Sequence, residues 1–163
     1  MNRKIFGFLM LITVALAFGA PAAFAQVSET DQLQQLRADI QADRQALVAA
    51  NLGLTDAEGT AFWPLYREYR AELGKVGDRT QKLIQDFAKI YESATPEQAK
   101  GMVDEMMAIQ RDDFKVKESF VPKFRKVIPE VKVARLLQIE NKLDAIIKYE
   151  LADAIPLIGT AKK

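Results

Sequence analysis

The sequence predicts an all-α fold of four helices. From Gln26 onward, apolar residues recur at intervals of three and four, the spacing that gathers them on one face of an α-helix. No stretch alternates apolar and polar residues for long enough to indicate a β-strand. The second and third predicted helices would each hold about 30 residues and measure roughly 45 Å, which is long for one domain of this size. We therefore expect long, bent central helices that form an elongated hairpin-like bundle and dimerise along an apolar face.

The first predicted helix starts near Ser28 or Thr30 and runs to about Ala50. Gly53 is placed to end it, because glycine readily adopts the left-handed conformation found at helix C-termini. The apolar residues expected on its inner face are Leu33, Leu36, Ile40 and Leu47.

The second predicted helix begins after Leu54, at a capping box. Thr55 can accept a hydrogen bond from the amide of Glu58, whose side chain can accept one from the Thr55 amide. Pro64 should kink this helix, because proline has no amide hydrogen to donate. Downstream, a coiled-coil-like seam is formed by Phe62, Tyr66, Tyr69, Leu73, Val76, Thr80, Leu83, Phe87 and Ile90.

The stretch SATPEQAK, residues 93–100, ends the second helix and begins the third. Thr95 is suited to the N-cap, Pro96 to the first helical position and Gln98 to the capping-box partner. The third helix should run to about Val127 and bend at Pro122.

This third helix carries two adjacent apolar stripes. The first comprises Met102, Met106, Ile109, Val116, Phe120, Phe124 and Val127, and the second comprises Val103, Met107, Phe114, Val121 and Ile128. A small bundle cannot easily cover both stripes, so the helix is either central or faces a partner.

A fourth helix is predicted from Glu130 to Ala154, opened by Pro129 and closed by Pro156. Its inward residues should be Val133, Leu136, Leu137, Leu143, Ile147 and Leu151. Residues 26–156 would then form a single helical domain, followed by a C-terminal tail at 157–163.

Residues 1–25 have the layout of a secretory signal peptide. Arg3 and Lys4 precede an apolar run, and Ala23-Phe24-Ala25 supplies a small-x-small cleavage site. The alternative is an uncleaved anchor, since the same stretch could span a bilayer. Cleavage is favoured by the Ala-x-Ala site, and it predicts secretion.

The amino-acid composition excludes several classes of function. The chain has no Cys and no His, which removes Cys and His nucleophiles, the imidazole base, disulfides and the common zinc and copper ligand sets. Loss of Arg3 and Lys4 would change the formal net charge from +1 to −1, so nothing draws the molecule to nucleic acid. We therefore expect no enzyme, no cofactor and no nucleic-acid partner.

Charge is nevertheless uneven along the chain. The stretch 115–135 is rich in Lys and Arg, and the stretch 26–60 is rich in Asp and Glu. We interpret these stretches as pairing with each other within the molecule or across a dimer.

The two caps resemble the Leu-Thr-x-x-Gln motif that repeats at helix starts in the Spy/CpxP family of periplasmic proteins. The first copy reads Leu54-Thr55-Asp56-Ala57-Glu58, with Glu in place of Gln, and the second reads Ala94-Thr95-Pro96-Glu97-Gln98, with Ala in place of Leu. The resemblance implies a periplasmic, cradle-shaped homodimer of bent helices. Such a protein holds unfolded or partly folded envelope proteins without ATP, or docks on the periplasmic domain of a sensor kinase in a stress response.

The third helix is the candidate surface for such partners, because methionine side chains adapt to varied contacts and basic residues lie beside them. The candidate client-binding residues are Met102, Met106, Phe114, Lys117, Phe120, Lys123 and Phe124. The alternative is that these methionines only fill the core.

Other residues offer competing hypotheses. A metal-responsive or metal-buffering envelope protein would use the carboxylates Asp104, Glu105, Asp112 and Asp113, although charges on a solvated helix face explain them more simply. Glu140 falls among apolar neighbours; we expect it to pair with Arg135 or Arg67 rather than to act as a shifted-pKa catalyst. Trp63 is either a core anchor beside Pro64 or an aromatic that stacks on a ligand.

Overall fold

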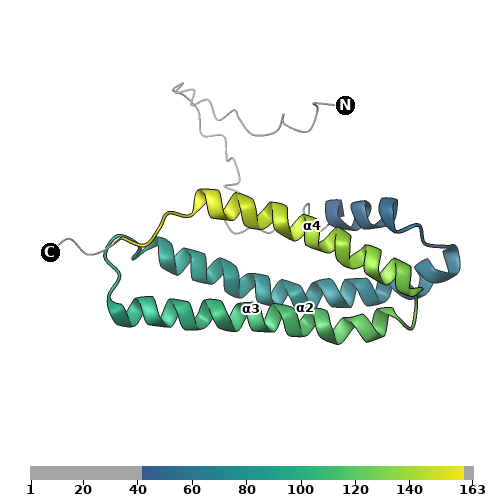
Figure 1. Cartoon of the computed structure of the whole chain (residues 1–163), viewed down its shortest axis with the longest axis horizontal. Helices are drawn as coiled ribbons and strands as arrows, with labels where there is room; N and C mark the ends of the chain where they lie inside the picture. Colours follow the sequence, from purple (N-terminus) through teal and green to yellow (C-terminus); the bar gives the residue numbers. More distant parts are fainter. Residues whose placement is uncertain (1–41, 160–163) are drawn as a thin grey trace, which may run out of the picture. The chain divides into compact units, whose positions relative to one another are not determined.

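The structure is a computed structural model and describes residues 42–159 (Figure 1). These residues belong to one compact unit. They form a helical segment at 42–52, followed by α2 (Asp56–Ala88), α3 (Pro96–Phe124) and α4 (Glu130–Ala154). No strand occurs between residues 42 and 159, so the all-α prediction is confirmed.

Part of the predicted organisation lies outside the described residues. This applies to the signal peptide at 1–25, to the start of the first predicted helix with Leu33, Leu36 and Ile40, and to the last residues of the tail.

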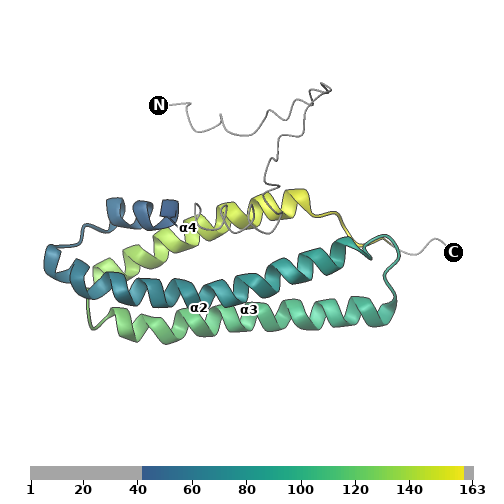
Figure 2. The ribbon, with the colours of Figure 1, turned by 180° about the vertical axis from the view of Figure 1, so that it is seen from behind.

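Helices α2 and α3 lie side by side and antiparallel, joined by the turn at residues 89–95 (Figures 1 and 2). Helix α4 runs back along α2, and the segment 42–52 lies beside the first half of α4. Lys132, in the first turn of α4, donates to the backbone oxygen of Gly53 at 2.6 Å and pairs with Glu58 at the same distance. A residue of the basic stretch thus pairs with one of the acidic stretch, as predicted.

The core lies where all the described helical segments meet. The ring of Phe62 in α2 is 5.6 Å from that of Phe124 in α3, and Tyr69 is 5.4 Å from Phe120. Aromatic rings at these separations attract one another beyond the effect of burial alone. The buried apolar residues of this cluster are Val48, Leu52, Phe62, Tyr66, Tyr69, Leu73, Phe120, Phe124, Ile128, Val133 and Leu136.

Local signals set the helix boundaries as predicted. Thr55 and Thr95 each complete a capping box, with Glu58 and Gln98 as the respective partners. Gly53 adopts a φ of 62°, a left-handed conformation in which a Cβ would be strained, directly after the segment 42–52. The predicted bounds of the last helix, 130–154, are those of α4.

Three details differ from the sequence-based expectation. Ile147 of α4, which was expected to point inward, is exposed. Leu47 is exposed, and the buried residues of its segment are Arg44, Val48 and Leu52. The inner face of this segment therefore consists of residues four positions apart, and the first of them, Arg44, donates to the Glu140 carboxylate of α4. Helix α3 ends at Phe124 rather than near Val127, two residues after Pro122.

The part of α2 and α3 near the turn 89–95 is packed less tightly. Between residues 74 and 108, all of which the structure describes, no residue is buried. The chain after α4 returns to this region, where the Gly159 amide donates to the carbonyl of Tyr91 at 2.6 Å. A Cβ at Gly159 would lie 3.2 Å from that oxygen, so the close approach favours glycine. Between residues 42 and 159, no helix has both the length and the apolar character needed to cross a membrane.

Candidate functional site

The outer face of α3 carries a row of exposed apolar side chains. Residues three, four and seven apart share one face of a helix, so these side chains lie along one side of α3, with the exposed Gln110 and Arg111 between Met107 and Phe114. The row consists of Val103, Met106, Met107 and Phe114, which are 53%, 43%, 45% and 64% exposed. We call these four residues the α3 apolar surface.

Three of the predicted client-binding residues fall on or beside this surface. Met106 and Phe114 belong to it, and Met102 is half-buried between α2 and α3. Two members of the surface, Val103 and Met107, were not predicted as client-binding residues. Their membership of the second apolar stripe is the signal that could have identified them.

Phe120 and Phe124 are not available to a partner, contrary to the prediction. Both are buried against Tyr69, whose ring lies 5.4 and 5.5 Å from theirs. Helix α2 covers this half of the first stripe, so the two rings stabilise the fold.

The two predicted basic residues, Lys117 and Lys123, are engaged within the molecule. Lys117 lies 2.8 Å from Asp113 and 2.9 Å from Asp144 of α4. Burial opposes the charge of Lys117, but these carboxylates raise its pKa overall. Lys123 pairs with Glu68 at 3.1 Å and lies 4.0 Å above the ring of Phe120. Lys117 therefore links α3 to α4, and Lys123 links α3 to α2.

A buried charged cluster lies between the segment 42–52, α2 and α4. One oxygen of Glu140 accepts from Arg44 at 2.8 Å and from Arg70 at 2.9 Å, and the other accepts from the Tyr66 hydroxyl at 2.6 Å. Burial, followed by the negative charge of Glu140, raises the pKa of Tyr66 well above its ordinary value.

The predicted partners of Glu140, Arg135 and Arg67, were wrong. Both are exposed, because Arg135 projects from another side of α4 and Arg67 lies one residue beyond the inward-facing Tyr66. Glu140 is buried and both of its oxygens are occupied, so no substrate could reach it without breaking an ion pair. The geometry supports a structural role for this carboxylate.

The carboxylates of the metal hypothesis are also engaged. Arg79 of α2 binds Glu105 at 2.9 Å and Asp112 at 2.6 Å, and these contacts lower the pKa of both carboxyl groups. Asp104 pairs with Lys100, and Asp113 with Lys117. Within residues 42–159, no three acidic side chains gather closely enough to hold a metal ion.

Trp63 combines features of both hypotheses made for it. Its indole packs edge-on against Phe62 and Tyr66, with ring centres 5.0 and 5.8 Å away. It is nevertheless only half-buried and lines an open groove.

Comparison with protein-family models, with curated proteins and with solved structures gives no match for this chain.

Proposed function

We propose that this chain is a periplasmic protein that binds other proteins, either as an ATP-independent holding chaperone or as an envelope-stress accessory protein of the Spy/CpxP type. The α3 apolar surface is the observation that carries the proposal. Exposed apolar side chains that gather on one side of a protein commonly mark a site that binds another molecule. A surface that includes two methionines suits partners of varied shape.

The expected partners are unfolded or partly folded envelope proteins, whose apolar segments would cover this surface. The periplasmic domain of a sensor kinase is the alternative partner. The proposal assigns residues 1–25 to a signal peptide that is cleaved during export.

The proposal also includes a quaternary arrangement. Helices α2 and α3 contain 33 and 29 residues and are therefore about 50 and 44 Å long. We infer that they form an elongated hairpin that pairs into a cradle-shaped homodimer, with the α3 apolar surface facing the client.

The test is suppression of aggregation of an unrelated, chemically unfolded protein by residues 26–163 in the absence of ATP. We expect suppression at near-stoichiometric ratios. The double substitution Met107→Ser and Phe114→Ser should require several-fold more protein for the same suppression, because it removes exposed apolar area and leaves the core intact. Salt should have little effect, since Lys117 and Lys123 are already paired.

The matched control is the double substitution Val131→Ser and Tyr149→Ser. These α4 side chains are 74% and 72% exposed and lie outside the α3 apolar surface. Circular dichroism would establish that all variants are equally folded. The general-chaperone proposal is wrong if the wild-type chain fails at several-fold excess, or if the control pair matters as much as the α3 pair.

A further inference from the structure

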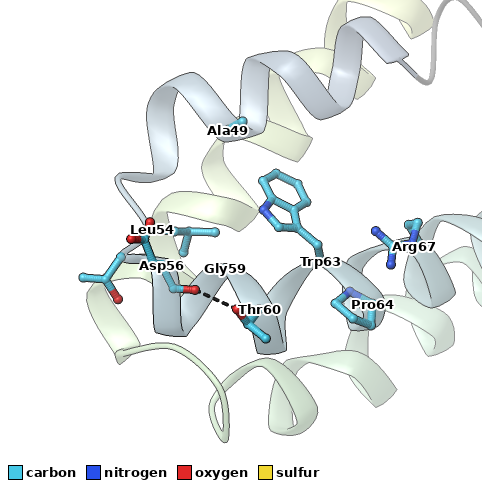
Figure 3. Close-up of a pocket in the computed structure, with 9 residues that line it drawn as sticks. Ala49, Leu54, Asp56, Gly59, Thr60, Trp63, Pro64 and Arg67 are labelled. Carbon is cyan, nitrogen blue, oxygen red and sulfur yellow. Dashed lines mark hydrogen bonds between the residues drawn. The ribbon is translucent and has the colours of Figure 1, made fainter.

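A groove of about 600 Å³ lies where the segment 42–52 meets the first turns of α2 (Figure 3). We call it the Trp63 groove. Its apolar lining comes from Ala49, Leu54, Trp63 and Pro64, and it shares no residue with the α3 apolar surface.

The indole of Trp63 is a fixed platform in this groove. The edge-on contacts with Phe62 and Tyr66 hold the ring on its inner side, while Figure 3 shows it standing between Leu54 and Arg67. A Cβ at Gly59 would lie 3.6 Å from the indole nitrogen, so glycine leaves that edge of the ring uncovered. No residue in the described part of the chain accepts a hydrogen bond from the indole N–H.

Opposite charges mark the two ends of the groove. Asp56 and Arg67 both line it and are exposed, and neither has an ion-pair partner among residues 42–159. Glu58, two residues after Asp56, is already paired with Lys132, and Glu68, next to Arg67, is paired with Lys123. Asp56 and Arg67 are eleven positions apart in α2, so their Cα atoms are separated by about 16 Å along the helix axis at 1.5 Å per residue. The first and fifth residues of an extended peptide are about 13 Å apart at 3.3 Å per residue, and the length of the charged side chains covers the difference.

We propose that the Trp63 groove binds an extended segment of another protein that lays an apolar side chain on the indole and pairs an acidic side chain with Arg67. A basic side chain four residues away then meets Asp56. Proteins that capture a chain terminus hold its carboxylate in a nest of backbone amides. Around Arg67 the backbone amides are used within α2, so a side-chain carboxylate is the better match for a lone guanidinium.

Trp63 is the only tryptophan in the sequence, so intrinsic fluorescence reports directly on the groove. The probe is the peptide acetyl-Lys-Ala-Leu-Ala-Glu-amide, titrated into the full mature chain. We expect a saturable change in emission. A second peptide with Gln in place of Glu should bind more weakly by up to about fivefold, the upper end of the range for one exposed ion pair.

Variants test whether Arg67 makes this contact. Arg67→Gln should weaken binding of the Glu peptide by the same factor and leave the Gln peptide unaffected, which is the coupling expected of a direct pair. Arg135→Gln, an exposed arginine of α4, is the matched control and should change neither titration.

Three results would overturn the proposal. They are the absence of any emission change at millimolar peptide, equal affinities for the Glu and Gln peptides, and an equal effect of Arg135→Gln. Emission that changes with protein concentration and not with peptide would assign the groove to a second copy of the chain, and would also overturn it. Because the groove and the α3 apolar surface are separate, the aggregation assay can fail while the peptide still binds.

Discussion

At one end of the α2–α3 pair, side chains from every described helical segment meet in a sealed core, whereas toward the turn 89–95 the same two helices bury no side chain. We call the first region the aromatic end, centred on Tyr69 and Phe124, and the second the turn end, residues 74–108. Both regions use the same seam of apolar residues at intervals of three and four. The difference therefore arises from what covers the seam, not from the seam itself.

At the aromatic end, α4 and the segment 42–52 add a third and fourth side to the α2–α3 pair. At the turn end, the seam residues Leu83, Phe87 and Ile90 remain half-buried. Three of the four residues of the α3 apolar surface, Val103, Met106 and Met107, lie in this loosely packed part. The comparison shows that burial is concentrated at the aromatic end, whereas these three side chains are exposed at the turn end.

The largest contrast should come from comparing the charged clusters at the two ends. Glu140→Ala should lower the free energy of unfolding by about 3–5 kcal/mol, because it removes the carboxylate that Arg70 pairs with and leaves the buried Arg44 with Asp144 as its remaining partner. Glu105→Ala, which removes one partner of the half-exposed Arg79 and leaves Asp112 as the other, should have a much smaller effect. Urea denaturation measures both. Similar losses for the two variants would contradict the comparison.

Truncating one phenylalanine at each end tests the apolar part of the comparison. Phe124→Ala should cost about 3–5 kcal/mol, since it opens a cavity among the rings of Phe62, Tyr69 and Phe120. Phe87→Ala should cost clearly less, because its ring is half-exposed and packs on Tyr91 alone among aromatic residues. Thermal unfolding of both variants provides the measurement, and an equal drop in melting temperature would count against it.

Alkaline pH should destabilise the aromatic end through its tyrosines. Burial, followed by the charge of Glu140, raises the pKa of both Tyr66 and Tyr69. Above pH 10, the ordinary tyrosine value, the unfolded chain loses these protons while the folded chain keeps them. The free energy of unfolding should therefore fall by about 1.4 kcal/mol per pH unit for each tyrosine. It should be unaffected by these two groups below pH 10.

The double substitution Tyr66→Phe and Tyr69→Phe is the control for this pH effect. Whatever the stability of the double variant at neutral pH, its free energy of unfolding should decline less steeply between pH 10 and 11 than that of the wild type. Denaturation curves at several pH values would show the change in slope, and an unchanged slope would assign the alkaline loss to other groups.

Much of the local structure could be predicted because its causes lie within a few residues. Both capping boxes, the left-handed Gly53 and the bounds of α4 depend on neighbours three or four positions away. The all-α class followed from the same short-range periodicity.

Long-range pairing could not be predicted in the same way. Arg44 and Glu140 are 96 residues apart, and no pattern in the sequence joins them. The inner face expected from Leu47 was wrong for the same reason, since the choice between Leu47 and Arg44 depends on a carboxylate in another helix.

The candidate site shows a related limit. Both stripes of α3 are apolar in sequence, and it is contact with α2 that buries Phe120 while Phe114 is exposed. The exposed apolar residues of α3 were therefore identified only in part, since Met106 and Phe114 were named as candidates and Val103 and Met107 were not.

The smallest expected effect, and the finest test of the comparison, comes from the two N-caps. Thr55 starts α2 at the aromatic end and Thr95 starts α3 at the turn end, and each closes the same capping box. Thr55→Ala should reduce the global free energy of unfolding by about 1 kcal/mol. Thr95→Ala should reduce it less, because the loosely packed start of α3 can open without unfolding the core.

Hydrogen exchange separates these outcomes at two matched amides. Gly59 and Ala99 each donate the first helical hydrogen bond, to the carbonyls of Thr55 and Thr95, at 2.8 and 2.9 Å. Thr95→Ala should accelerate exchange at Ala99 more than its global effect explains, whereas exchange at Gly59 in Thr55→Ala should track global stability. If both amides instead follow global unfolding, the turn end is as cooperative as the aromatic end, and the α3 apolar surface must be regarded as part of one rigid body.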